Sequence, residues 1–178
     1  ATQHGIQVIR AAGGNAVSVA EHTVALMFST IKRLLPLDAG MRAGRWEKAG
    51  FLGRELSGMR LGLVGGGAIA AAVAKLVKGM GLDVLVYDPY ASVDAIEAMG
   101  ARRAERIEDL LRQSDIVSLH CPLTESNTHM LNAAMLALMP ADSYVINTSR
   151  GGLIDEAALL AALESGHIAG AGLDTFEQ

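Results

Sequence analysis

Short apolar runs alternate with longer mixed stretches along most of the chain, and this alternation predicts a series of strands and helices. The apolar runs predict strands at residues 61–64, 83–87, near 101, 116–120, 144–147 and 168–173. The stretches between them predict helices at residues 67–78, 93–99, 106–113, 132–138 and 155–164. Regular alternation of strand and helix favours a parallel sheet with helices on both faces. The expected fold is therefore α/β, a doubly wound parallel sheet in three layers.

The segment before Arg60 has a different pattern. A short strand is expected at residues 6–9, followed by a turn at residues 13–15 and a long helix from Val17 to Leu35. In that helix most positions are apolar, and the polar residues form one narrow stripe of Ser18, His22, Ser29 and Arg33. Such a helix is buried on most sides, either within the domain or against another subunit. Residues 46–57 are expected to form a loop.

Composition narrows the class of protein. At 178 residues the chain is long enough for one well-buried domain, and the working assumption is a single domain over residues 1–178. A net charge of −4 without a basic stripe gives no support for nucleic-acid binding, and neither a membrane-spanning run nor a signal peptide is found. The chain is expected to be soluble and cytoplasmic. A single cysteine, Cys121, excludes an internal disulfide and a multi-cysteine metal site, and no metal site is predicted.

The most informative motif lies between the strands expected at residues 61–64 and 83–87. Gly65, Gly67 and Ala70 form a Gly-x-Gly-x-x-Ala turn between a strand and a helix, and Asp88 follows the next strand. Gly65 permits the tight turn, Gly67 lets the backbone approach a pyrophosphate, and Ala70 keeps the helix close to the strand. Asp88 can accept hydrogen bonds from an adenosine ribose and repel a 2′-phosphate. The motif therefore predicts a Rossmann dinucleotide-binding fold that prefers NAD to NADP.

Ligands of such sheets bind beyond the carboxyl ends of the strands. At those ends the sequence resembles the D-isomer-specific 2-hydroxyacid dehydrogenase family, and the similar segments follow the family order over nearly the whole chain. These segments are residues 18–22 (Ser-Val-Ala-Glu-His), 61–70, 87–89 (Tyr-Asp-Pro), 120–124 (His-Cys-Pro-Leu-Thr), 147–152 (Asn-Thr-Ser-Arg-Gly-Gly) and 170–174 (Gly-Ala-Gly-Leu-Asp).

The resemblance implies a role for each site residue. Pyrophosphate contacts are implied for Gly65, Gly67, Ala68 and Ile69, and an adenosine ribose contact for Asp88. The turn at Cys121 and Pro122 would border the adenine, and Thr148 and Asp174 would hold the nicotinamide carboxamide. Arg150 would bind the carboxylate and carbonyl of a 2-oxo acid, because a guanidinium fork recognises both. Another interpretation of Arg150 is a surface salt bridge.

One position departs from the family pattern. Ala68 stands where the family often has arginine or lysine, which removes a phosphate contact worth about 1 kcal/mol.

The family also uses a glutamate and a histidine to move the proton. The glutamate position falls just beyond Gln178, and no histidine of this chain matches the catalytic one. His4, His22, His120, His129 and His167 are therefore expected to be structural or solvent-exposed. The chain is interpreted as the NAD-binding domain of a larger two-domain dehydrogenase whose substrate domain lies elsewhere.

Two other functional hypotheses remain beside the dehydrogenase. One is an NAD-sensing corepressor-like module of the same family, and the other is a Rossmann enzyme with an adenosyl cofactor. The expected substrate is a small 2-hydroxy or 2-oxo acid; phosphoglycerate, lactate, glycerate and bulkier acids remain open. By resemblance, the helix from Val17 to Leu35 forms a homodimer contact.

Overall fold

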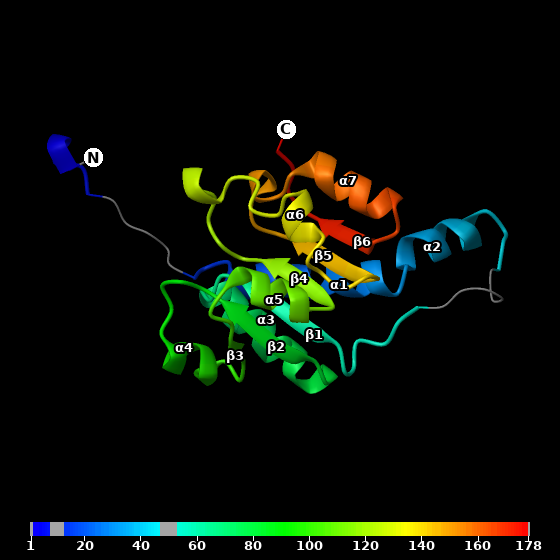
Figure 1. The fold of residues 1–178 in the computed structure, drawn as a ribbon, viewed down its shortest axis with the longest axis horizontal. Helices are drawn as coiled ribbons and strands as arrows, with labels where there is room; N and C mark the ends of the chain where they lie inside the picture. Colours follow the sequence, from blue (N-terminus) through cyan, green and yellow to red (C-terminus); the bar gives the residue numbers. More distant parts are fainter. Residues whose placement is uncertain (1, 8–12, 47–52, 178) are drawn as a thin grey trace.

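Six strands form one sheet in the computed structural model, which describes residues 2–7, 13–46 and 53–177. Neighbouring strands pair in parallel throughout, in the order β3-β2-β1-β4-β5-β6 (Figure 1). The strands are β1 (Arg60–Val64), β2 (Asp83–Tyr87), β3 (Arg102–Arg103), β4 (Ile116–Leu119), β5 (Ser143–Asn147) and β6 (Ile168–Leu173). This is the doubly wound α/β fold that the sequence predicts, and the order reverses between β1 and β4.

Helices cover both faces of the sheet. On one face lie α1 (Ala16–Ile31), α3 (Ala68–Val77) and α4 (Val93–Ala98), and on the other α5 (Ile107–Gln113), α6 (Ala133–Leu136) and α7 (Glu156–Glu164). The helix α2 (Leu34–Arg42) follows α1 and lies to the right of the strands in Figure 1. Four single-turn 3-10 helices complete the described chain, namely η1 (Thr2–His4), η2 (Lys78–Met80), η3 (Glu125–Asn127) and η4 (Gly151–Leu153).

In the central strands β1, β2, β4 and β5, successive residues enter two different cores. In β1, Leu61 and Leu63 pack with α1 and α3, whereas Val64 packs in the core under α5. Because both faces are covered, the central strands are apolar without alternation. That is why their positions could be recognised from apolar runs alone, and each strand predicted beyond Arg60 lies within one or two residues of an observed one.

The amino-terminal segment departs from the prediction in two places. Residues 6 and 7 have no regular structure, so the strand expected at residues 6–9 does not form there, and residues 8 and 9 lie outside the described ones. The helix expected from Val17 to Leu35 ends at Ile31, and Arg33 adopts a left-handed backbone (φ 51°) before α2 begins. A continuous helix would drive the ring of Pro36 into the carbonyl of Lys32, which explains the break.

Within the domain only one side of α1 is covered, so the first of the two predicted ways of burying this helix does not account for its other side. Its buried residues are Ala16, Ala20, Thr23, Met27 and Ile31. The opposite side exposes Val17, Ser18, Glu21, His22 and Ala25 to solvent.

The loop expected at residues 46–57 is confirmed for residue 46 and residues 53–57; residues 47–52 lie outside the described ones.

Gly62 provides a test of how closely β1 and α5 pack. A Cβ at this position would overlap the side chains of Leu110 and Ser114, and Ser114 is held by a 2.7 Å hydrogen bond from its Oγ to the carbonyl of Leu110. We expect Gly62→Ala to lower the free energy of unfolding by about 1–3 kcal/mol because the core is overpacked.

The control is Gly79→Ala, since no atom lies within 4 Å of a Cβ at that position. Its effect on urea denaturation is expected to stay within about 0.5 kcal/mol. Equal stability of the two variants would contradict the close packing of α5 on β1.

Candidate dinucleotide-binding site

The glycine turn after β1 is held between the ends of two neighbouring strands. Gly65 has φ +102°, and a Cβ there would lie 2.8–2.9 Å from the backbone of His120 and Cys121 at the end of β4. Its N–H donates to the carbonyl of Tyr87 at the end of β2 (2.8 Å). Only glycine satisfies both the backbone conformation and the close approach.

The first turn of α3 is open to a ligand. Gly67 and Ala68 are exposed, no atom lies within 4 Å of a Cβ at Gly67, and no side chain caps the helix. The N–H groups of the first turn have no partner within a helix, so they suit an anion such as a pyrophosphate. Ile69 is half-buried, and Ala70 is fully buried against the sheet. The residues present therefore fit the phosphate end of a dinucleotide.

Asp88 has a structural role that the sequence did not indicate. Its Oδ2 accepts a hydrogen bond from the N–H of Gly66 (2.7 Å), and its Oδ1 accepts from Tyr90 and Ala91 (2.8 and 3.2 Å). The carboxylate therefore ties the glycine turn to the loop before α4. A carboxylate oxygen can accept more than one hydrogen bond, so Oδ2 keeps acceptor capacity for a sugar hydroxyl.

The end of β4 supplies a partly buried and uncharged wall. Burial lowers the pKa of His120 to about 4, and its Nε2 lies 2.9 Å from the Oγ of Ser118. Burial also raises the pKa of the Cys121 thiol, which is therefore protonated and a poor nucleophile. Pro122 is exposed beside it, and the carbonyl of Cys121 accepts a 2.6 Å hydrogen bond from Ser149.

The ends of β5 and β6 lie side by side. Asn147 pairs with Leu173, and the N–H of Asp174 donates to the carbonyl of Asn147 (2.9 Å). Thr148 and Asp174 are the next residues of the two strands, so they are neighbours at the same edge. Thr148 is nearly buried, whereas the side chain of Asp174 is half-exposed.

Two consecutive residues of α1 contact this pair, and sequence reasoning missed both roles. Nε2 of His22 lies 3.2 Å from Oδ1 of Asp174, and Oγ1 of Thr23 lies 2.9 Å from Oγ1 of Thr148. His22 belongs to the polar stripe that the sequence shows, but its partner is 152 residues away. No local pattern reports such a contact.

Arg150 lies at the surface of the same edge. Its guanidinium donates to the carbonyl of Ser149 (2.7 Å), and its own carbonyl accepts from Nδ2 of Asn147 (2.9 Å). No carboxylate in the described part of the chain pairs with its side chain, so the salt-bridge interpretation has no support there. Gly151 is packed directly against the backbone of Phe176, which fixes the turn after Arg150.

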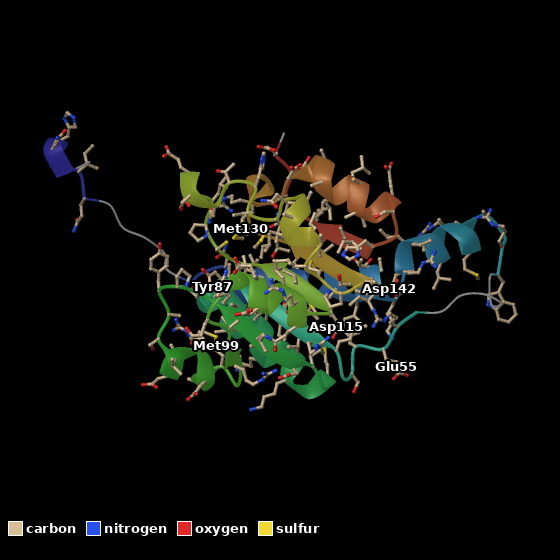
Figure 2. The ribbon with its side chains drawn as sticks, in the orientation of Figure 1. Glu55, Tyr87, Met99, Asp115, Met130 and Asp142 are labelled. Carbon is tan, nitrogen blue, oxygen red and sulfur yellow. The ribbon has the colours of Figure 1, made fainter. Side chains whose placement is uncertain are left out.

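Several predicted residues are thus joined by direct contacts. Asp88 bonds to Gly66, Gly65 packs on Cys121, Cys121 bonds to Ser149, and Ser149 lies between Thr148 and Arg150. Figure 2 shows the two ends of the sheet: Tyr87 of β2 and Met130 lie on the left, and Asp115 and Asp142 lie on the right. The candidate site is at the carboxyl end, on the side of Tyr87.

Two further histidines lie outside this chain of contacts. His129 pairs with Glu177 (3.0 Å), and His167 lies 3.3 Å from the carbonyl of Leu136. Among the described residues, no group of three or more His, Cys, Asp and Glu could hold a metal ion. No helix within the same residues is sufficiently long and apolar to span a bilayer.

Comparison with known proteins identifies the family. Residues 24–178 match the model of the D-isomer specific 2-hydroxyacid dehydrogenase, NAD binding domain. The chain belongs to this family. The match confirms the predicted family and the predicted cofactor, NAD. The parallel six-stranded sheet confirms the predicted fold.

The relatives include both curated proteins and solved structures. The chain is 39% identical to D-3-phosphoglycerate dehydrogenase of Bacillus subtilis (99% of this chain, 34% of the relative) and 40% identical to glyoxylate reductase of Thermococcus litoralis (100% and 56%). The structure of D-lactate dehydrogenase of Aquifex aeolicus, in complex with NAD and lactic acid, superimposes with a TM-score of 0.84 at 36% identity (92% and 49%). The chain therefore spans about a third to a half of the length of these relatives.

The partly buried His120 makes stability depend on pH. The unfolded chain binds a proton at this side chain near pH 6.5, whereas the folded chain binds it only near pH 4. Between these values the unfolded state holds more protons, so stability falls as the pH falls, by at most about 3 kcal/mol. We expect His120→Gln to lose this part of the pH dependence.

The measurement is urea denaturation of both proteins at pH 7.5 and pH 4.5. Other titrating groups are common to the two proteins and cancel in the difference. The same decrease in both proteins would contradict a neutral, partly buried His120.

Proposed function

We propose that this chain is the NAD-binding domain of a two-domain dehydrogenase that interconverts 2-hydroxy and 2-oxo acids. The observation that carries the proposal is the position of Arg150, two residues after Thr148 at the edge that carries the glycine turn, with a guanidinium that pairs with no carboxylate among the described residues. The catalytic glutamate and histidine of the family, together with the substrate domain, are assigned to other parts of the protein.

The cofactor lies across the carboxyl ends of the strands in this proposal. The N–H groups around Gly65, Gly67, Ala68 and Ile69 bind the pyrophosphate, because this helix end is exposed and uncapped. Bound NADH supplies the hydride.

The remaining contacts orient the two ends of the cofactor. Asp88 accepts from the adenosine ribose, and Cys121 and Pro122 border the adenine. Thr148 and Asp174 hold the carboxamide of the nicotinamide. The anionic carboxylate of Asp88 opposes a 2′-phosphate, which is the basis for preferring NAD to NADP.

In this proposal Arg150 binds the substrate. A guanidinium presents parallel N–H donors, which match a carboxylate and the adjacent carbonyl oxygen of a 2-oxo acid. Its positive charge also stabilises the negative charge that develops on that oxygen during reduction. The relatives are named for phosphoglycerate, glyoxylate and lactate, so we propose a small acid of this type.

The free thiol of Cys121 is consistent with a cytoplasmic enzyme.

We further propose that α1 and α2 form a homodimer contact. These helices and the residues after them expose large apolar side chains, namely Val17 (63%), Leu34 (48%), Leu35 (73%), Met41 (60%) and Trp46 (77%). Large apolar side chains exposed along one segment of a domain are typical of an interface between subunits.

Substitution of Arg150 tests the assigned reaction. In the full-length protein we expect Arg150→Gln to lower kcat/KM for glyoxylate reduction, D-lactate oxidation or D-3-phosphoglycerate oxidation by about 100-fold, because charge stabilisation at the carbonyl is lost. Arg150→Lys should recover part of the loss, since it keeps the charge but not the fork.

The control is the Kd for NADH, measured by fluorescence titration, which should stay unchanged in both variants. Full activity of Arg150→Gln would remove Arg150 from the reaction. Binding of NADH by the unaltered protein without turnover of any 2-oxo or 2-hydroxy acid would support a sensor and overturn the dehydrogenase.

Leu35→Asp tests the proposed dimer. Leu35 is 73% exposed, so aspartate can be accommodated in the monomer, whereas a charge in an apolar interface is costly. We expect sedimentation to show a shift from dimer to monomer. The matched control is Leu160→Asp on α7, also exposed (56%) but outside α1 and α2. A dimer that persists in Leu35→Asp would place the interface elsewhere.

A further inference from the structure

The contacts between α1 and the ends of β5 and β6 determine which groups there can donate hydrogen bonds. Oγ1 of Thr23 donates to the carbonyl of Val19 (2.8 Å), and a carbonyl can only accept. A hydroxyl has a single hydrogen, so Thr23 has none left for Thr148. In the 2.9 Å contact between the two hydroxyls, Thr148 is therefore the donor and Thr23 the acceptor.

Thr148 is consequently left with acceptor capacity alone. Its one hydrogen is directed at Thr23, and only the lone pairs of Oγ1 remain for another partner. A threonine in isolation could either donate or accept, so the contact with α1 removes an ambiguity.

Asp174 has the same character. Since a carboxylate has no hydrogen to donate, Nε2 of His22 carries the hydrogen in its 3.2 Å contact with Oδ1. No hydrogen bond reaches Oδ2 from any residue that the structure describes. The two neighbouring strand ends therefore present two acceptors side by side.

We propose that His22 and Thr23 are positioning residues that commit Asp174 and Thr148 to accept hydrogen bonds from a ligand –NH₂ group. The inference rests on the proposed function, in which that group is the carboxamide of the nicotinamide. An amide –NH₂ carries two hydrogens and suits two acceptors. A ketone in the same place would leave both acceptors without a partner, and a carboxylate would be repelled.

Binding of a cofactor analogue without the –NH₂ group tests whether Thr148 and Asp174 act only as hydrogen-bond acceptors. The probe is reduced 3-acetylpyridine adenine dinucleotide, in which an acetyl group replaces the carboxamide. The full-length protein is expected to bind NADH at least about tenfold more tightly than this probe, because the probe has no –NH₂ hydrogens for the nearly buried hydroxyl of Thr148 and for Oδ2 of Asp174.

Thr23→Val should reduce that preference to within about threefold, since the freed hydroxyl hydrogen of Thr148 can donate to the acetyl oxygen. Thr23→Ser keeps the hydroxyl and should restore the preference. In the second arm, His22→Leu should reduce the preference, because Asp174 loses the donor that orients it, and His22→Gln should retain it through its amide N–H.

Thermal melting shows whether each variant is folded. His22 is half-exposed, so the second arm remains informative if the buried Thr23→Val does not fold. Equal affinity of the unaltered protein for NADH and the probe would overturn the inference and leave the proposed function in place. An unchanged preference in folded Thr23→Val and in His22→Leu would also overturn it. Failure to bind either cofactor would overturn the proposed function itself.

Discussion

The close approach of Gly65 to the end of β4 is the constraint on which the site depends. The space that a side chain at Gly65 would need is occupied by the backbone of His120 and Cys121. Because the turn can lie this deep between β2 and β4, α3 starts directly above the sheet with Ala70 fully buried. A larger residue at Gly65 would push the turn outward, and the first turn of α3 would no longer face the strand ends. The reversal of strand order between β1 and β4 places this turn at the usual ligand crevice of such sheets.

The rest of the edge is organised by polar contacts that cross between strands. Asp88 holds the glycine turn from one side, and the bond from Ser149 to Cys121 joins β5 to β4 on the other. Both contacts end on backbone atoms, so they place the main chain rather than individual side chains. Preorganised backbone groups suit a ligand that is recognised largely through its phosphates and its carboxamide group.

Helix α1 has two different sides, and both bear on the site. Its inner side fills the core with Ala20, Met27 and Ile31, and it also directs Thr23 at Thr148. Its outer side exposes Val17 and carries His22, which reaches Asp174. A subunit packed on this outer side would therefore lie beside the nicotinamide end of the proposed cofactor site.

The sequence alone determined the strands, most helices and the glycine turn, because these depend on local properties: apolar runs, helix breakers and the backbone freedom of glycine. It also placed the site residues at strand ends, since a parallel sheet brings those ends to one edge. The break at Arg33 was a local signal too, carried by Pro36, but the apolar pattern across it hid the signal. Only the tertiary structure decided that Asp88 binds the turn and that His22 and Thr23 contact Asp174 and Thr148. Those contacts join residues far apart in the chain, and their geometry exists only after the helices have packed on the sheet.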